Sequence, residues 1–165
     1  MARRYSDQYA SPVNQAITAG VVGNSQTAWS YRGPSATEAG KPTLVRATYN
    51  LANGTINIAS TDDLFICALP IGARITRLSI STGDDDLDSD NNFTFNLGWT
   101  GSLTAILSGS TVLQAGAETN LGQEELDEIA AVTVDGAHLT LTSAAGELNA
   151  SGIIYFLVEY VVPTT

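Results

Sequence analysis

The stretch GIIYFLVEYVV, Gly152–Val162, decides the fold class of this chain. β-Branched and aromatic side chains fill it almost without interruption, and both kinds favour the pleated, packed surface of a sheet. Its length and apolar content predict a central strand, which needs a neighbouring strand on each side. The neighbours must come from the residues that precede it in the chain.

Strand signals recur at short intervals from Pro42 onward. Apolar and polar residues alternate in segments 43–51, 73–82 and 92–99, as they do in strands with one buried face. The alternation in 73–82 slips by one residue near Arg77. Segment 63–70, DLFICALP, is almost continuously apolar, which is typical of a strand covered on both faces. Further strands are expected at 103–108, 131–136 and 137–143.

Eight or nine short strands, with turn signals every ~8–12 residues, predict an all-β fold: an antiparallel β-sandwich or a jelly-roll-like barrel. One short helix of two or three turns is expected in GQEELDEIAA, residues 122–131. Acidic side chains occupy its first turn, where the helix dipole favours them. Helical segments are too few for an α/β fold built from βαβ units.

The first 40 residues differ from the rest of the chain. They are rich in small and amide side chains and show no sustained strand or helix period. A floppy tail is one interpretation, but such tails are usually depleted in Tyr and Trp, which occur here four times. We therefore predict an extended N-terminal arm over residues 1–40 that orders on a partner, followed by a β-sandwich body over residues 41–165. The expected partner-binding residues are Arg3, Arg4, Tyr5, Tyr9, Trp29, Tyr31 and Arg32.

Charge is distributed unevenly along the chain, whose formal net charge is −10. All seven basic residues lie in the first 77 positions, together with only four of the 17 acidic ones. The remaining 88 residues carry 13 acidic side chains and no Lys or Arg. Nucleic acid is therefore not an expected partner, because binding phosphates requires cations. A membrane is not expected either, since no apolar run approaches the ~20 residues that cross a bilayer.

Residue types that carry catalysis or bind transition metals are scarce. The single histidine, His138, lies on an expected strand, and the chain contains no nucleophile-elbow motif G-x-S-x-G. The single cysteine, Cys67, lies among apolar neighbours, where we expect a buried and inert thiol. Zinc sites need several His and Cys ligands. We therefore expect no enzymatic activity, no catalytic residues and no cofactor.

The segment STGDDDLDSDNNF, Ser81–Phe93, contains five aspartates and has two interpretations. Asp86, Asp88 and Asp90 form the D-x-D-x-D pattern that begins an EF-hand loop, and Ca²⁺ prefers such hard oxygen ligands. The rest of the EF-hand pattern fails, because Leu97 stands where the bidentate acid belongs and the context is strand–turn–strand. The simpler interpretation is a hairpin loop that like charges hold open in water.

The order of strands and turns carries a resemblance. LPIGARITRLSIST, Leu69–Thr82, is similar to a Leu-Pro-x-Gly-Ala-x-Val pattern that is followed by an acidic or Gly-rich turn. A strand like NFTFNLGW and a final apolar strand like IIYFLVEYVV complete the series. Over residues Pro42 to Val162 the chain thus resembles small virion structural proteins of tailed bacteriophages, among them the cement proteins that decorate capsids.

The resemblance implies a non-enzymatic β-sandwich protein that binds and stabilises the outside of a phage capsid. It implies synthesis in the host cytoplasm and a place on the capsid exterior of the virion. The implied partners are the major capsid protein, whose neighbouring subunits the arm would bridge, and further copies of this chain in a homotrimer. The alternative is a tail, connector or head-fibre protein. In one version it binds glycans with Trp99 or Tyr160 at the sugar site, but both residues fall on expected apolar faces, which favours a role in the core.

Overall fold

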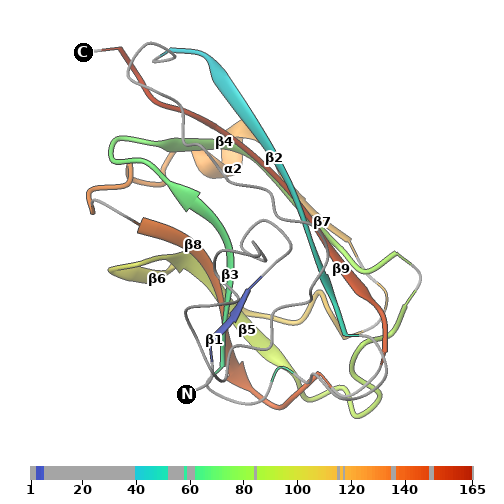
Figure 1. Cartoon of the computed structure of the whole chain (residues 1–165). Coiled ribbons are helices and arrows are strands. Elements are labelled where there is room, and N and C mark those ends of the chain that lie inside the picture. Colours follow the sequence, from blue (N-terminus) through green and yellow to red (C-terminus); the bar gives the residue numbers. More distant parts are fainter. Residues whose placement is uncertain are drawn as a thin grey trace, which may run out of the picture.

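The structure is a computed structural model that describes residues 3–5, 40–51, 58, 62–83, 85–114, 116, 118–134, 137–148 and 151–164. Within these residues the chain is almost entirely β-structure, arranged as two sheets that face each other (Figure 1). The predicted all-β sandwich is confirmed. The described strands form two separate sheets and not a closed barrel.

The first sheet contains four antiparallel strands in the order β2-β9-β4-β7. Their bounds are β2 Pro42–Asn50, β9 Ile153–Val161, β4 Arg74–Ser81 and β7 Glu118–Leu121. β9 lies between β2 and β4 and pairs with both, so the predicted central strand is confirmed. Because side chains alternate across a strand, one face of β9 points inward. Its buried side chains are Ile154, Phe156, Val158 and Tyr160.

The second sheet contains five strands in the order β1-β3-β8-β5-β6. Their bounds are β1 Arg3–Tyr5, β3 Asp63–Leu69, β8 Ala137–Ala145, β5 Thr94–Trp99 and β6 Ser102–Ser110. The neighbours pair antiparallel except for β1, which pairs with β3 in parallel. The β3–β8–β5 part therefore forms a continuous antiparallel layer opposite the first sheet.

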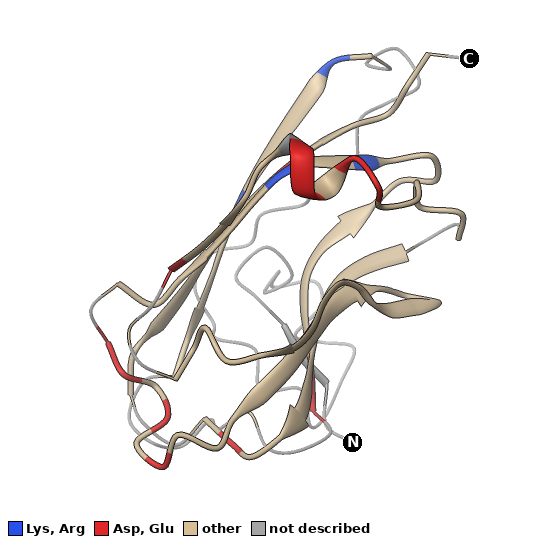
Figure 2. Cartoon of the chain, turned by 180° about the vertical axis from the view of Figure 1, so that it is seen from behind, with Lys and Arg blue, Asp and Glu red and all other residues tan. Residues whose placement is uncertain are grey.

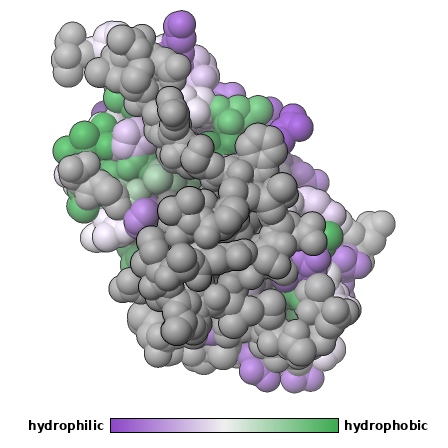
Figure 3. Space-filling view, in the orientation of Figure 1, coloured by the Kyte–Doolittle hydropathy of each residue, from purple (hydrophilic) through white to green (hydrophobic). Residues whose placement is uncertain are grey.

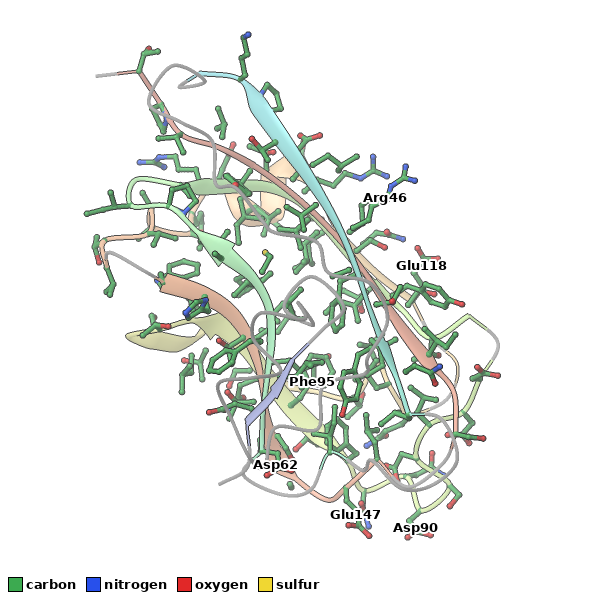
Figure 4. All side chains as sticks on the ribbon, viewed as in Figure 1. Arg46, Asp62, Asp90, Phe95, Glu118 and Glu147 are labelled. Carbon is green, nitrogen blue, oxygen red and sulfur yellow. The ribbon has the colours of Figure 1, made fainter. Side chains whose placement is uncertain are left out.

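The hydrophobic core fills the space between the two sheets. β5 shows how alternation builds it, because Phe95, Leu97 and Trp99 are buried while Thr94 is half-buried. Phe95 lies in the interior of the sandwich (Figure 4). Burying one such side chain contributes roughly 1.5–3 kcal/mol to folding.

The slip in the alternation near Arg77 corresponds to a β-bulge. The register of β4 against β9 shifts between Ile75 and Arg77, so two successive residues face away from the core. Thr76 Oγ1 donates a hydrogen bond to Glu159 Oε1 on the neighbouring strand at 2.8 Å. The bulge keeps both Ile75 and Leu78 buried on the inner face.

Two sequence predictions were wrong. The helix expected over residues 122–131 is shorter than predicted, because α2, Gln123–Leu126, makes a single turn instead of two or three. It is also too short to cross a bilayer, as is any other helix among the described residues. Acidic Asp127 and Glu128 follow at once, where they would oppose the negative end of a longer helix dipole. The strand predicted at 131–136 does not form over the described residues 131–134, where Val132 instead bonds to the turn between β3 and β4.

Candidate functional site

The two ends of the sandwich differ in charge: among the residues that Figure 2 colours by charge, acidic residues without basic ones lie at one end, whereas basic residues and the acidic α2 lie at the other. We call one the acidic end: the loop 82–92 between β4 and β5, together with Asp62, Asp63 and Glu147. Asp62, Asp90 and Glu147 lie together at this end (Figure 4). Asp62 and Asp63 are buried, whereas Asp90 and Glu147 are exposed. The acidic end therefore combines a charged surface with carboxylates that belong to the packed structure.

Asp88 departs from the exposed aspartates of the loop. It is completely buried, and its Oδ2 accepts a hydrogen bond from the backbone N–H of Phe93 at 2.6 Å. The backbone N–H of Asp88 donates to Asp86 Oδ1 at 3.0 Å, and its carbonyl accepts from Asn91 N at 3.0 Å. Asp88 thus anchors the loop from within. The interpretation of these aspartates as a loop kept in water is wrong at this residue.

Two glycines allow the loop to approach the body closely. A Cβ at Gly152 would lie 2.9 Å from Asp85 Oδ2 and would overlap the side chain of Leu87. A Cβ at Gly146, where φ is +68°, would lie 2.7 Å from the carbonyl oxygen of Asn92. Glycine is the residue that permits such close backbone approach. The loop path is therefore fixed by residues far away in the sequence.

The three aspartates of the proposed calcium turn have unlike surroundings. Asp88 is buried, whereas Asp86 and Asp90 are exposed. Oδ1 of Asp88 has no hydrogen-bond partner among the described residues. Within the same residues, no three His, Cys, Asp or Glu side chains form a group able to hold a metal ion. The structure explains Asp88 as a structural acceptor, and calcium binding by this loop stays the untested alternative.

The single cysteine and the single histidine of the chain both pack against other residues of the fold. Cys67 is fully buried on β3, and burial raises the pKa of its thiol to about 12, so the thiol stays protonated at neutral pH. His138 is half-buried on β8, and its ring packs against Phe65 with centroids 5.2 Å apart. The expectation of a buried cysteine is confirmed, and the inertness of its thiol stays a prediction.

The aromatic residues proposed for a sugar site are part of the core. Trp99 is 4% exposed at the end of β5, and Tyr160 is fully buried on β9. Burial raises the pKa of the Tyr160 hydroxyl to about 12. Neither ring presents a face to solvent on which a sugar could stack.

The predicted partner-binding residues are only partly described. Arg3, Arg4 and Tyr5 form β1 and pair in register with Asp63, Leu64 and Phe65 of β3. Tyr9, Trp29, Tyr31 and Arg32 lie outside the described residues. Contact of these seven residues with a partner stays a prediction, as does the division into an arm and a body at residue 40.

Sequence analysis missed a group of exposed apolar residues at the opposite end. We call this end the apolar tip: the turn Pro70–Ala73, the turn Thr100–Leu103 and the segment Val132–Val134. Its exposed large side chains are Ile71 (56% exposed), Leu103 (40%) and Val134 (36%). The signal in the sequence was an isoleucine inside a Pro-x-Gly turn, where no core is near enough to cover it.

Comparison with known structures finds a similar fold in chains of two phage capsid structures. A chain of the capsid of Ralstonia phage GP4 matches with a TM-score of 0.65 and 21% identity, covering 99% of this chain and 100% of that chain. A chain of the cyanophage Pam1 capsid asymmetric unit matches with a TM-score of 0.58 and 23% identity, covering 85% and 96%. No protein-family model and no curated protein matches the sequence. At these identities the likeness shows a shared fold.

Proposed function

We propose that this chain is a non-enzymatic structural protein of a tailed-phage virion that binds and stabilises the outside of the capsid as a cement protein. The observation that carries the proposal is the fold match to a chain of the GP4 phage capsid over 99% of this chain and 100% of that one. The match spans both chains, so the likeness concerns the whole sandwich and not a fragment of it. The strand pattern of residues Pro42 to Val162 supports the same role independently.

The size of the body suits this role. A packed shell resists the outward push of its contents when another protein buries surface across the joint between two shell subunits. A specific interface buries about 800 Å² on each partner. The chain exposes 8461 Å², so such an interface uses about a tenth of its surface. The rest remains available for contacts with neighbouring copies.

The N-terminal arm, residues 1–40, is proposed to bridge neighbouring capsid subunits. An extended chain spans about 3.3 Å per residue, so few residues cover a long path. Its expected contacts are those of Arg3, Arg4, Tyr5, Tyr9, Trp29, Tyr31 and Arg32, which would meet an acidic and apolar surface. Ordering the arm costs entropy, and a homotrimer offsets that cost because each docked copy raises the effective concentration of the next.

A tail, connector or head-fibre role remains the alternative, because it fits a virion protein with the same fold. Its glycan-binding version loses support, since Trp99 and Tyr160 are buried in the core. A sugar site on this chain would therefore have to use other side chains.

A decoration assay tests the cement role. Particles of the encoding phage are prepared without this protein, mixed with the purified full-length chain, and pelleted to measure the bound fraction. We expect saturable binding by the full chain and none by a chain that lacks residues 1–35, with the truncated body still folded although it loses the β1–β3 pairing. Failure of the full chain to bind contradicts the cement role. Full binding by the truncated chain contradicts only the arm.

A further inference from the structure

The outer edge of the second sheet is closed by β1. Arg3–Tyr5 pair in parallel with residues 63–65 of β3, which pairs with β8 on its other side. β1 is therefore the last strand on this side of the sheet and lies along β3 (Figure 1). We call the edge that receives it, residues 63–65 of β3, the β3 slot. A sheet edge offers backbone donors and acceptors to an added strand, whether that strand comes from the same chain or from another.

Contacts with β8 hold the β3 slot in place. Thr142 Oγ1 donates a hydrogen bond to Asp63 Oδ1 at 2.8 Å, and Ser143 N–H donates to the carbonyl of Asp62 at 3.0 Å. Leu64, in the middle of the slot, is fully buried in the core. The slot is therefore part of the packed body, and its position is fixed from the side opposite β1.

The charges of the slot and of β1 are opposite. Asp63 begins β3 and Asp62 precedes it. Both belong to the acidic end, which forms the lower margin of Figure 3, where hydrophilic side chains gather. β1 contributes two arginines, whereas the other four strands of the second sheet contain no Lys or Arg. Arg3 is the register neighbour of Asp63, and opposite charges on neighbouring strands favour their pairing, so the sequence of β1 suits this edge.

The connection between β1 and β2 is longer than a single copy requires. Residues 6–39, 34 in all, lie between Tyr5 and Gly40. A compact chain of 165 residues is roughly 40 Å across, since its radius of gyration is about 15 Å. About 12 extended residues cross that distance, and connections longer than about 12–15 residues are uncommon within compact domains. At ~3.3 Å per residue the connection can reach about 110 Å, which is far enough to carry β1 to the slot of an adjacent copy.

β1 is also a strand that can exchange. Its pairing with β3 covers only three residues and is parallel, and parallel pairing is less stable per residue than antiparallel pairing. A short strand at the edge of a sheet opens at a lower free energy than the core does. β1 can therefore leave one slot and enter another while the body stays folded.

We propose that the β3 slot of each copy accepts Arg3–Tyr5 of a neighbouring copy when the protein assembles on the capsid, so that copies are linked by strand exchange. This inference rests on the proposed cement function and names the partner of one part of the arm. A single copy fills its own slot with its own β1. Assembly replaces that strand by the same strand of the next copy, which is the exchange of an identical element between protomers.

A second copy is the partner that these observations favour. The strand seated on the slot is a segment of this chain, and each copy supplies one such strand and one slot. Exchange around a symmetry axis therefore closes a ring in which every slot is filled. On the particle, docking holds neighbouring copies close together, which raises the effective concentration of one copy's strand at the next copy's slot. Residues 6–39 then cross the joint between copies, as the bridging role of the arm requires.

Cross-linking between two different variants of the full-length chain tests the exchange. Tyr5 and Phe65 are register neighbours in β1 and β3, at a spacing that suits a disulfide. An equimolar mixture of Tyr5→Cys and Phe65→Cys chains, the first with a size tag, is bound to particles that lack this protein, oxidised and run on a non-reducing gel. Because each chain carries only one of the two substitutions, a disulfide between positions 5 and 65 requires two copies. Cys67 is fully buried, and each variant alone controls for disulfides that involve it.

We expect a mixed covalent dimer on the particles that contains up to about half of the Tyr5→Cys chains, because each of them meets a Phe65→Cys neighbour half of the time. The matched control mixes Tyr5→Cys with Leu103→Cys and should give no such dimer. Leu103 is 40% exposed on β6, at the opposite edge of the same sheet. If Phe65→Cys does not fold, Arg3→Cys and Asp63→Cys replace the pair, since they are neighbours in the same register.

A charge reversal tests the complementarity of strand and slot. Arg3→Glu with Arg4→Glu, added to the Tyr5→Cys chain, should lower the yield of the mixed dimer severalfold, because acidic residues would then meet the acidic end. Lys41→Glu with Arg74→Glu makes the same change of charge beside the first sheet and should leave the yield unchanged.

Binding of the unmodified chain to the same particles is measured in parallel, together with a chain that carries both Tyr5→Cys and Phe65→Cys. Bound copies that give no mixed dimer, while the double variant forms only an internal disulfide, overturn the inference and leave the cement function in place. Bound copies that form no disulfide between positions 5 and 65 in either experiment also overturn it, since a strand of the shell protein would then fill the slot. No binding by the unmodified chain removes the cement function itself.

Discussion

The acidic end and the apolar tip both reverse the usual distribution of side chains, but in opposite ways. At the acidic end the carboxylate of Asp88 is fully buried, and it accepts a hydrogen bond from Phe93 N–H at 2.6 Å. At the tip an isoleucine is left outside, with 56% of Ile71 exposed. The buried carboxylate is bonded and therefore serves folding. The exposed isoleucine has no comparable role in the fold.

The largest effect is expected where the tip meets the core, at Gly98 of β5. A Cβ there would overlap the Ser102 carbonyl oxygen and lie 2.6 Å from the Leu103 carbonyl carbon. Backbone atoms cannot move aside without disrupting the β5–β6 pairing. Gly98→Ala should therefore lower the free energy of unfolding by about 3 kcal/mol, measured by urea denaturation.

Gly83→Ala is the matched control from the acidic end. Gly83 has a φ of +66°, and a Cβ there would meet nothing within 4 Å. Only the strain of a left-handed backbone applies, so the loss should be about 1 kcal/mol. Equal losses in the two variants would show that steric overlap at Gly98 contributes little to its effect on stability.

The next effect concerns the buried carboxylate of the acidic end. Asp88→Ala leaves the N–H of Phe93 buried without its partner, which should cost about 2–3 kcal/mol of unfolding free energy. Glu147→Gln removes an exposed charge at the same end and should change stability by less than about 0.5 kcal/mol. Thermal and urea denaturation measure both. An Asp88→Ala protein as stable as the wild type would contradict the anchoring role.

The pH dependence of the unfolding free energy tests the burial of Cys67, which lies in the core between the two ends. Burial raises the pKa of Cys67 from 9.0 to about 12, so above pH 9 the unfolded chain releases the thiol proton first. Stability from this group is complete below pH 9 and is lost as the pH rises toward 12, by up to about 1.4 kcal/mol per pH unit. Cys67→Ala should flatten the alkaline loss measured by urea denaturation from pH 8 to 11. Parallel curves for the two proteins would contradict burial of the thiol.

The smallest effect on stability is expected at the tip surface. Ile71→Ser removes an exposed side chain and should change the free energy of unfolding by less than about 0.5 kcal/mol. Differential scanning calorimetry measures the change. A loss above about 1 kcal/mol would place Ile71 in the core, and the contrast between the two ends would then fail.

Local patterns predicted most of the longer strands, because each of these encodes which of its faces is buried, but they did not predict the short strand β7. The alternation of β9 and β5 needed no knowledge of the partner strands, and even the slip at Arg77 appears as a bulge between Ile75 and Arg77. The segment 131–136 shows the limit of this argument. Val132 and Val134 alternate with polar residues as in a strand, but the backbone of Val132 forms hydrogen bonds with the β3–β4 turn. The local sequence pattern does not predict this tertiary contact.

The candidate surfaces depended on contacts that are distant in sequence. The run of similar aspartates gave no sign that Asp88 would be buried, because the path of the loop depends on Gly146 and Gly152. The exposure of Ile71 likewise depends on where the neighbouring turns end. Composition could argue against a catalytic or zinc site, but it could not locate a contact surface.

The most direct test of the cement role is the copy number of this chain in purified particles, measured by quantitative mass spectrometry relative to the major shell protein. A protein that coats the capsid should be present at a ratio near one, or at a simple fraction set by the symmetry axes of the shell. A few copies per particle would contradict the cement role and indicate a tail or connector component instead.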